Sequence, residues 1–180
     1  MFKVALAFIS LVTAPVLAYL APVPRNVIVL PSDSRPIAVR LMDQINAHRH
    51  EYGLAPLEID PVAQRAAQFQ AEDMQANDVM RHADSSGRSP LTRYADFGGR
   101  AGMYGENVAY YGDELSELAQ QWAAVAKLDG MMMAEKPPQD GHRENILSPN
   151  YSAVGIGVAV GPHGIFVAED FVGRGDIASK

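Results

Sequence analysis

Cysteine is absent from the 180 residues of this chain. The chain therefore has no disulfide framework, no zinc–thiolate site and no cysteine nucleophile, and any metal ion would have to bind through His, Asp or Glu. Internal repeats and low-complexity segments are absent as well. With 48% hydrophobic and 20% charged residues, the composition is that of one ordinary globular domain with a substantial core.

A basic surface is also missing. Lys and Arg number 15 against 21 acidic residues, so the formal net charge is -6. No segment gathers the basic residues into a stripe of the kind that binds phosphate backbones. We therefore expect no nucleic-acid partner.

Long hydrophobic runs are absent except near the N-terminus, where residues 4–12 are mostly apolar and follow Lys3. This run is shorter than the ~20 residues of a membrane span, and Ser10, Thr13 and Pro15 interrupt it. We interpret residues 1–18 as a signal peptide and residues 19–34 as an extended linker. The alternative is an uncleaved anchor running on toward Leu30, which would be the only membrane contact. Under either interpretation the folded part is secreted or periplasmic.

Helical periodicity and capping residues predict four helices. Asp60 and Ser89 each stand before a proline, which is typical of a helix cap followed by a first-turn proline. Asp113 is the expected cap of the last helix and Gly130 its expected end. The predicted helices span residues 36–52, 61–77, 90–97 and 114–130. The inward face of the second is expected to consist of Val62, Ala66, Phe69 and Met74.

Three consecutive methionines, Met131 to Met133, follow the last predicted helix. Methionine fills irregular gaps, so the simpler interpretation is gap filling or a flexible loop. The alternative is a soft lid over an apolar ligand. Pro137-Pro138 prevents further helix after this run.

Three strands are predicted in the second half of the chain. Residues 104–111 are typical of an edge strand, and residues 154–160 and 165–172 form a hairpin. In the first strand of the hairpin, valine and isoleucine line one face, while Gly155 and Gly157 lie on the other and permit another backbone to approach closely. Neither hairpin strand alternates cleanly with polar residues, so both faces of the sheet should be covered.

Helices before and between these strands predict an α+β fold. We expect a three-layer α-β-α sandwich with a mostly antiparallel central sheet, formed by residues 35–173. Residues 174–180 are a short C-terminal tail.

Three ionisable residues are candidates for a functional site: His82, Glu106 and His142. They are far apart in sequence, so only the fold can bring them together. Two imidazoles and a carboxylate suit Zn²⁺ or another divalent metal with an open position for water. Without a metal, Glu106 could fix the tautomer of one imidazole and leave its other nitrogen free for proton transfer. The remaining interpretation is a structural hydrogen-bond network that holds loops together.

Several motifs together resemble the CAP superfamily (cysteine-rich secretory proteins, antigen 5 and pathogenesis-related proteins), in its shorter cysteine-free bacterial form. The resemblance extends from about residue 37 to residue 172. Each motif is weak alone, but their order and spacing are specific. They are residues 41–49, 66–74, 105–109, 141–147 and 154–158, with His82 and Trp122.

This resemblance implies an α-β-α sandwich with a central cleft that carries two histidines and two acidic residues. His82 and His142 match the histidine positions, and Glu106 matches the first acidic position. The second acid of many members lies three residues after the helix tryptophan, where this chain has Val125. The candidates to replace it are Asp129, Glu135 and Asp140.

The resulting functional hypothesis is a secreted or periplasmic binding module. It rests on the retained histidines and glutamate and on the lack of a recognisable nucleophile. The expected ligand is a divalent metal such as Zn²⁺, a lipid or another cell-envelope component. One alternative is a hydrolase that uses Glu106 and the histidines, with or without a metal-bound water. The other is a structural or adhesive domain with a vestigial cleft.

Overall fold

The computed structural model of the protein describes residues 35–173, and the predicted signal peptide, linker and C-terminal tail lie outside this range. Within it, five helices and four strands follow one another along the chain. They are α1 (Ile37–Glu51), β1 (Glu58–Ile59), α2 (Pro61–Asn77), α3 (Pro90–Asp96), β2 (Met103–Tyr111), α4 (Leu118–Met133), α5 (Gly141–Ile146), β3 (Ala153–Gly161) and β4 (Gly164–Gly173).

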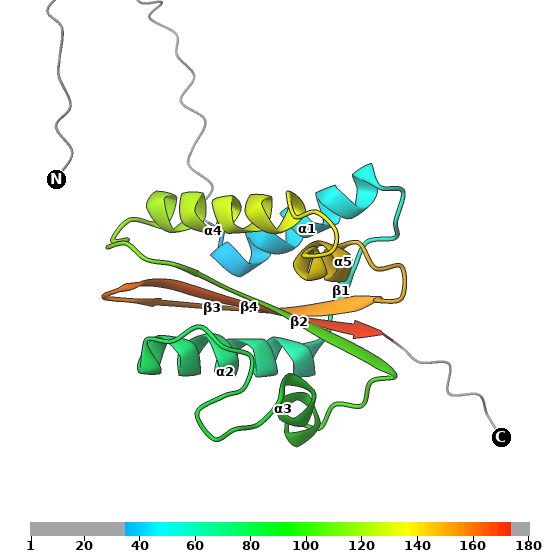
Figure 1. The fold of residues 1–180 in the computed structure, drawn as a ribbon, viewed down its shortest axis with the longest axis horizontal. Helices are drawn as coiled ribbons and strands as arrows, with labels where there is room; N and C mark the ends of the chain where they lie inside the picture. The colour runs from blue at the N-terminus through cyan, green and yellow to red at the C-terminus, as the bar shows by residue number, and fades with distance from the viewer. Residues whose placement is uncertain (1–34, 174–180) are drawn as a thin grey trace, which may run out of the picture. The chain divides into compact units, whose positions relative to one another are not determined.

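The strands form one sheet in the order β1-β3-β4-β2. β4 pairs antiparallel with both β2 and β3, and β1 pairs parallel with β3. Helices α2 and α3 cover one face, and α1, α4 and α5 cover the other (Figure 1). The predicted three-layer sandwich with a mostly antiparallel sheet is confirmed. Strand β1 was not predicted, because two residues are too few to show an alternating pattern.

Local signals placed most elements correctly. The Asp60 side chain accepts hydrogen bonds from the backbone N–H groups of Val62 and Ala63 and so caps α2. Ser89 caps α3 in the same way. Gly53 follows α1 and has a φ of 69°, a left-handed backbone conformation that residues with a side chain rarely adopt. Every residue of β4 is buried, so the prediction that both sheet faces are covered is confirmed.

The predicted bounds of α4 were wrong at both ends. The helix begins at Leu118, because Glu117 and Gln120 form a capping box there. Asp113 accepts a hydrogen bond from the backbone N–H of the next residue, Glu114, and lies outside the helix. The helix continues through Gly130 as far as Met133, so the methionines form its last turn and not a loop.

The inward face of α2 differs from the prediction in one respect. Val62 and Phe69 are only half-buried, whereas small residues such as Ala63 and Ala67 are fully buried. These alanines lie directly against β3: a Cβ atom added at Gly157 would be 2.0 Å from the carbonyl oxygen of Ala67. The small face predicted for this strand is therefore a backbone-to-backbone contact with α2.

Strand β2 lies at one edge of the sheet, opposite to β1. Val108 packs with Ala67 and Met74 of α2, and Ala109 packs in the core on the other side of the sheet. Because side chains alternate along a strand, Glu106 faces the α2–α3 layer and Asn107 faces the α4–α5 layer. The two layers therefore meet at this edge.

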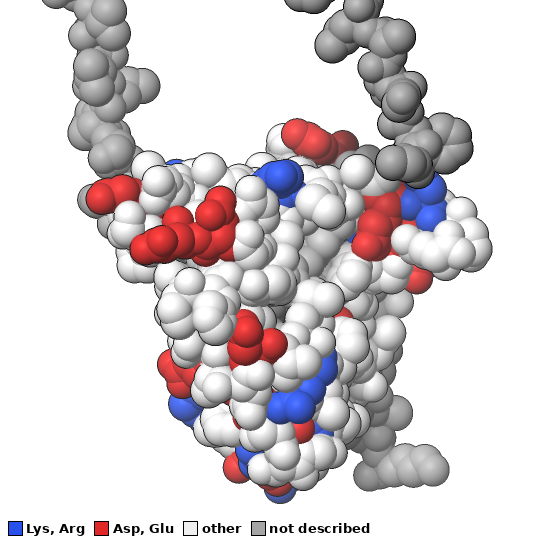
Figure 2. All heavy atoms as spheres, turned by 60° about the vertical axis from the view of Figure 1, so that its left-hand side comes forward, with Lys and Arg blue, Asp and Glu red and all other residues white. Residues whose placement is uncertain are grey.

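The surface agrees with the acidic composition. On the face shown in Figure 2, Asp and Glu side chains are spread over the molecule among fewer Lys and Arg side chains, which form no continuous basic area. Between residues 35 and 173, no helix combines the length and hydropathy required to cross a membrane.

Candidate functional site

A cleft of about 530 Å³ lies at the β2 edge and contains all three candidate residues. Apart from one glycine, every residue of its lining has a polar or charged side chain, and none is Lys or Arg. The lining consists of His82, Glu106, Asn107, Glu135, Gln139, Gly141, His142, Glu144 and Asn145.

His82 and Glu106 form the first histidine–carboxylate pair. The His82 Nδ1 atom lies 2.8 Å from Glu106 Oε1. The other oxygen of Glu106 accepts a hydrogen bond from Arg93, and both of these side chains are buried. Arg93 also donates to the backbone carbonyl of His82 at 2.7 Å. One buried guanidinium therefore holds both the carboxylate and the backbone of its histidine partner.

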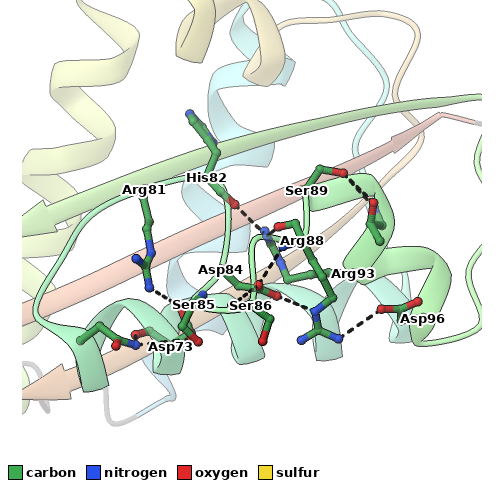
Figure 3. A network of polar contacts seen from close by, with 12 residues as sticks. Asp73, Arg81, His82, Asp84, Ser85, Ser86, Arg88, Ser89, Arg93 and Asp96 are labelled. Atoms are coloured by element: carbon green, nitrogen blue, oxygen red, sulfur yellow. Dashed lines mark hydrogen bonds and ion pairs between the residues drawn. The ribbon is translucent and has the colours of Figure 1, made fainter.

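The loop that carries His82 is fixed by polar contacts beneath it (Figure 3). Asp84 is buried and accepts hydrogen bonds from the backbone of Ser86 and of Arg88. The Arg88 side chain also donates to Asp84, at 2.7 Å. Figure 3 shows the His82 ring pointing away from this network, and 57% of the side chain is exposed. The loop is therefore ordered, while the imidazole stays accessible from the cleft.

His142 forms the second pair, and its partner is Glu135. The His142 Nδ1 atom lies 2.5 Å from Glu135 Oε1, and the backbone N–H of His142 donates to Oε2 at 3.1 Å. Between Glu135 and His142 the backbone makes a tight turn, which an isolated β-bridge between Lys136 and Gln139 closes. Of the three acids that could replace the one missing at Val125, Glu135 is the one that contacts a cleft histidine.

The other two acids have different surroundings. Asp129 is buried beneath α1, where it accepts hydrogen bonds from Gln44 and lies 2.7 Å from His48 Nε2. Asp140 is the residue before α5, and its carbonyl accepts from the Glu144 backbone. Val125 itself is a core residue with 1% exposure.

One member of each pair, His82 or Glu135, has a shifted pKa. The hydrogen bond to Glu106 raises the pKa of His82 above its ordinary value. Partial burial works to raise the pKa of Glu135, but hydrogen bonds from the His142 ring and from two backbone N–H groups outweigh it and lower that pKa. Glu135 is therefore a carboxylate at neutral pH. In each pair an Nδ1–H that donates to the carboxylate leaves Nε2 for a ligand.

Two asparagines connect the cleft to the sheet. Asn107 donates to the carbonyl of His142 at 3.2 Å, and Asn145 donates to the side-chain oxygen of Asn107 at 2.8 Å. Arg49 holds the other end of α5, because its guanidinium donates to the carbonyls of Ile146 and Ser148, both at 2.8 Å. The helix that carries His142 is thus fixed at both ends.

The three residues predicted as a metal set do not form one cluster. Both oxygens of Glu106 are engaged, by His82 and by Arg93, so Glu106 orients an imidazole. In the part of the chain that the structure describes, no three His, Asp or Glu side chains are grouped as they would be around a metal ion. A metal would therefore have to use the two imidazoles, with water or a ligand in its remaining positions. Metal binding by this cleft stays a prediction.

Arg93 is the site residue that sequence reasoning missed. It lies on the short helix α3, and an arginine is normally exposed. Nothing in the local pattern indicates that it is buried against Glu106. Glu135 was only one of three possibilities, and the signal that could have favoured it is the tight turn expected around Pro137-Pro138.

Comparison with known proteins identifies the family of the domain. A family model described as the cysteine-rich secretory protein family (CAP) matches residues 42–172. The chain is 26% identical to the uncharacterized protein YkwD of Bacillus subtilis (strain 168) over 144 residues, which are 80% of this chain and 50% of YkwD. It thus spans half the length of that relative.

Two solved structures share the fold. One is an extracellular protein containing a SCP domain from Bacillus anthracis, with a TM-score of 0.61 and 21% identity over 77% of this chain and 40% of that one. The other is an outer surface protein from Borrelia burgdorferi, with a TM-score of 0.64 and 17% identity over 79% of this chain and 96% of that one.

Proposed function

This chain belongs to the cysteine-rich secretory protein (CAP) family, and from that premise we propose that it is an extracellular binding module whose cleft takes a small polar ligand or a divalent metal ion. The observation that carries the proposal is the pair of carboxylate-oriented histidines in one polar cleft. A location outside the cytoplasm is supported by the predicted signal peptide. The described relatives from Bacillus anthracis and Borrelia burgdorferi are extracellular and outer-surface proteins.

The lining of the cleft restricts the class of ligand. An acyl chain is held best between apolar side chains, and the cleft lining contains no aliphatic side chain and no Phe, Tyr or Trp. Three glutamates and no Lys or Arg disfavour an anionic ligand. A cation, or an uncharged ligand rich in hydroxyl and amide groups, fits these side chains best.

A divalent metal ion is the simplest candidate. His82 and His142 would hold it through their Nε2 atoms, and their Glu106 and Glu135 partners would fix the ring orientation and raise the basicity of the rings. A bound metal would supply Lewis acidity to a ligand or water at its open positions. With only two protein ligands, its affinity should be below that of a closed four-ligand site.

Thermal unfolding tests this proposal directly. The protein without its predicted signal peptide is melted in EDTA, in excess Zn²⁺ and with N-acetylglucosamine oligomers as an uncharged polar probe. A ligand at about 100 times its Kd stabilises the folded state by about 2.7 kcal/mol, which raises the melting temperature by several degrees. We expect at least one probe to do so in the wild type and in His50→Ala, an exposed position on α1.

The same rise should disappear in His82→Ala and in His142→Ala. A rise that survives in both cleft variants would place the ligand elsewhere. If no probe changes the melting temperature of the wild type, the cleft binds neither Zn²⁺ nor this polar probe, and the result favours the structural or adhesive alternative.

Hydrolysis is a second candidate, favoured by one observation. An imidazole whose Nδ1 donates to a carboxylate presents Nε2 as a general base. No serine lines the cleft, and two of the three serines near His82 have other partners: Ser85 bonds to Asp73 and Ser89 caps α3. Any hydrolysis would therefore use activated water. An ester or amide substrate cleaved by the wild type but not by His82→Ala would support it, and equal rates would remove it.

A further inference from the structure

The outer edge of β3 is incompletely covered by another strand. β1 pairs with β3 only through Glu58–Ala153 and Ile59–Val154. Among residues 35–173, no strand lies beside the rest of this edge, from Ile156 to Val160. An edge of this kind presents unpaired N–H and C=O groups and is a template for pairing with another chain.

Two glutamines of α2 occupy that edge. The Gln64 side-chain amide donates to the carbonyl of Ile156 at 2.6 Å and accepts from its N–H at 3.0 Å. One turn later, Gln68 makes the same two contacts with Val158, at 3.1 Å each. Each amide thus reproduces the donor and acceptor that a neighbouring strand would offer.

The spacing of this arrangement follows from helix and strand geometry. Four residues of a helix rise about 6 Å, and two residues of a strand rise about 6.7 Å. A helix parallel to a strand can therefore place every fourth side chain beside every second strand residue. The glycine contact described above brings the α2 backbone close enough for the amides to reach. The series ends at Glu72, whose carboxylate cannot donate to a carbonyl and which accepts from Gln68 at 2.9 Å.

We propose that the outer edge of β3 is a strand-accepting surface that Gln64 and Gln68 keep closed, and that its partner when open is β3 of a second copy of this chain. The edge is self-complementary, because a two-fold axis at Val158 pairs Ile156 with Val160. All three residues are β-branched and favour strands. An apolar groove of about 290 Å³, lined in part by Val39, Met42 and Ile59, adjoins Gln64 and leaves room for side chains of an added strand. This inference is independent of the function proposed for the cleft.

The test removes the two glutamine side chains that bond to the edge of β3. In the double variant Gln64→Ala/Gln68→Ala, size-exclusion chromatography with light scattering should give twice the mass of the wild type as concentration increases. Arg65→Ala is the matched control, since Arg65 is exposed on the same helix and bonds to Pro61 and Phe97. It should keep the wild-type mass. A folded double variant that also keeps the wild-type mass at every concentration overturns the proposal.

Hydrogen exchange provides a second test that does not require the double variant to fold. In Gln68→Ala, the Val158 amide loses its acceptor and should exchange at least ~10-fold faster in dilute solution, where a second copy is scarce. Ile156, which keeps Gln64, is the internal reference and should change much less. Equal protection of Val158 in wild type and variant would show that the glutamine does not close the edge.

Discussion

Arg93 and Glu106 form the most buried charged contact of the cleft. Their side chains are 0% and 1% exposed, so water screens neither charge. Glu106 uses one oxygen for this contact and the other for His82. The carboxylate is therefore both a structural partner of Arg93 and the group that orients His82.

Replacing Glu106 removes one of these charges. In Glu106→Gln the buried Arg93 guanidinium loses the carboxylate to which it donates, and the free energy of unfolding should fall by about 3 kcal/mol. The pKa of His82 should also fall toward its ordinary value, because the hydrogen bond that raises it weakens. Urea denaturation measures the first effect and ring-proton NMR titration the second.

Glu144→Gln is the control for this variant. Glu144 lines the same cleft but is exposed, so its loss should change stability by no more than ~0.5 kcal/mol. Equal stability of the Glu106 and Glu144 variants would contradict the role assigned to the Arg93–Glu106 contact.

A second buried acid lies on the other face of the sheet. Glu169 accepts a hydrogen bond from Asn107 at 3.0 Å. Complete burial, with the nearby Asp129 charge adding to it, raises the pKa of Glu169 to about 8. The folded protein thus keeps a proton on Glu169 that the unfolded chain releases near its ordinary value of 4.5.

This difference predicts how stability depends on pH. Between about pH 4.5 and pH 8 the folded state binds more protons at Glu169 than the unfolded state, so stability falls as the pH rises. The slope from this group approaches about 1.4 kcal/mol per pH unit. Glu169→Gln removes this contribution to the slope. In urea denaturation, the free energy of unfolding of the variant should therefore increase relative to that of the wild type as the pH rises from about 5 to about 8. Parallel stability curves for the two proteins would show that Glu169 ionises normally.

At the scale of elements, the closest contact is between α2 and β3. A Cβ atom at Gly157 would lie 2.0 Å from a backbone oxygen of α2, so no side-chain rotation could relieve the clash. Gly157→Ala should lower the free energy of unfolding by about 3 kcal/mol, because helix and strand must move apart.

Gly130→Ala is the matched replacement in open space. Gly130 lies inside α4, and a Cβ atom there meets nothing within 4 Å. The free energy of unfolding of this variant should rise by about 0.5–1 kcal/mol, because alanine has less conformational entropy than glycine in the unfolded chain. If both alanine variants change stability alike in thermal and urea unfolding, the α2–β3 contact is looser than described.

The elements that sequence predicted correctly are those with local causes. Asp60 before Pro61, and the valine–glycine alternation of β3, depend on neighbours within a few residues. The end of α4 was misplaced because glycine only weakly opposes a helix, and packing of the buried Met132 outweighs it. Strand β1 exists only through its pairing with β3, so its own sequence carries no signal of it.

At the scale of the whole molecule, the cleft arises where two helical layers meet beside β2. His82 comes from the loop after α2 and His142 from α5, on opposite sides of the sheet. The resemblance to CAP proteins placed both histidines and Glu106 at one cleft, and all three line it. It could not select Glu135 or find Arg93, because both contacts depend on tertiary structure.

The central claim is that two histidines, each held by a carboxylate through Nδ1, present Nε2 to one ligand. Long-range ¹H–¹⁵N spectra of the histidine rings test it most directly, recorded before and after addition of Zn²⁺. Neutral His82 and His142 should both carry the proton on Nδ1, and Zn²⁺ should shift the Nε2 signals of these two rings while His50 stays unchanged. Protonation on Nε2 in either ring, or Zn²⁺ shifts confined to other histidines, would contradict the account.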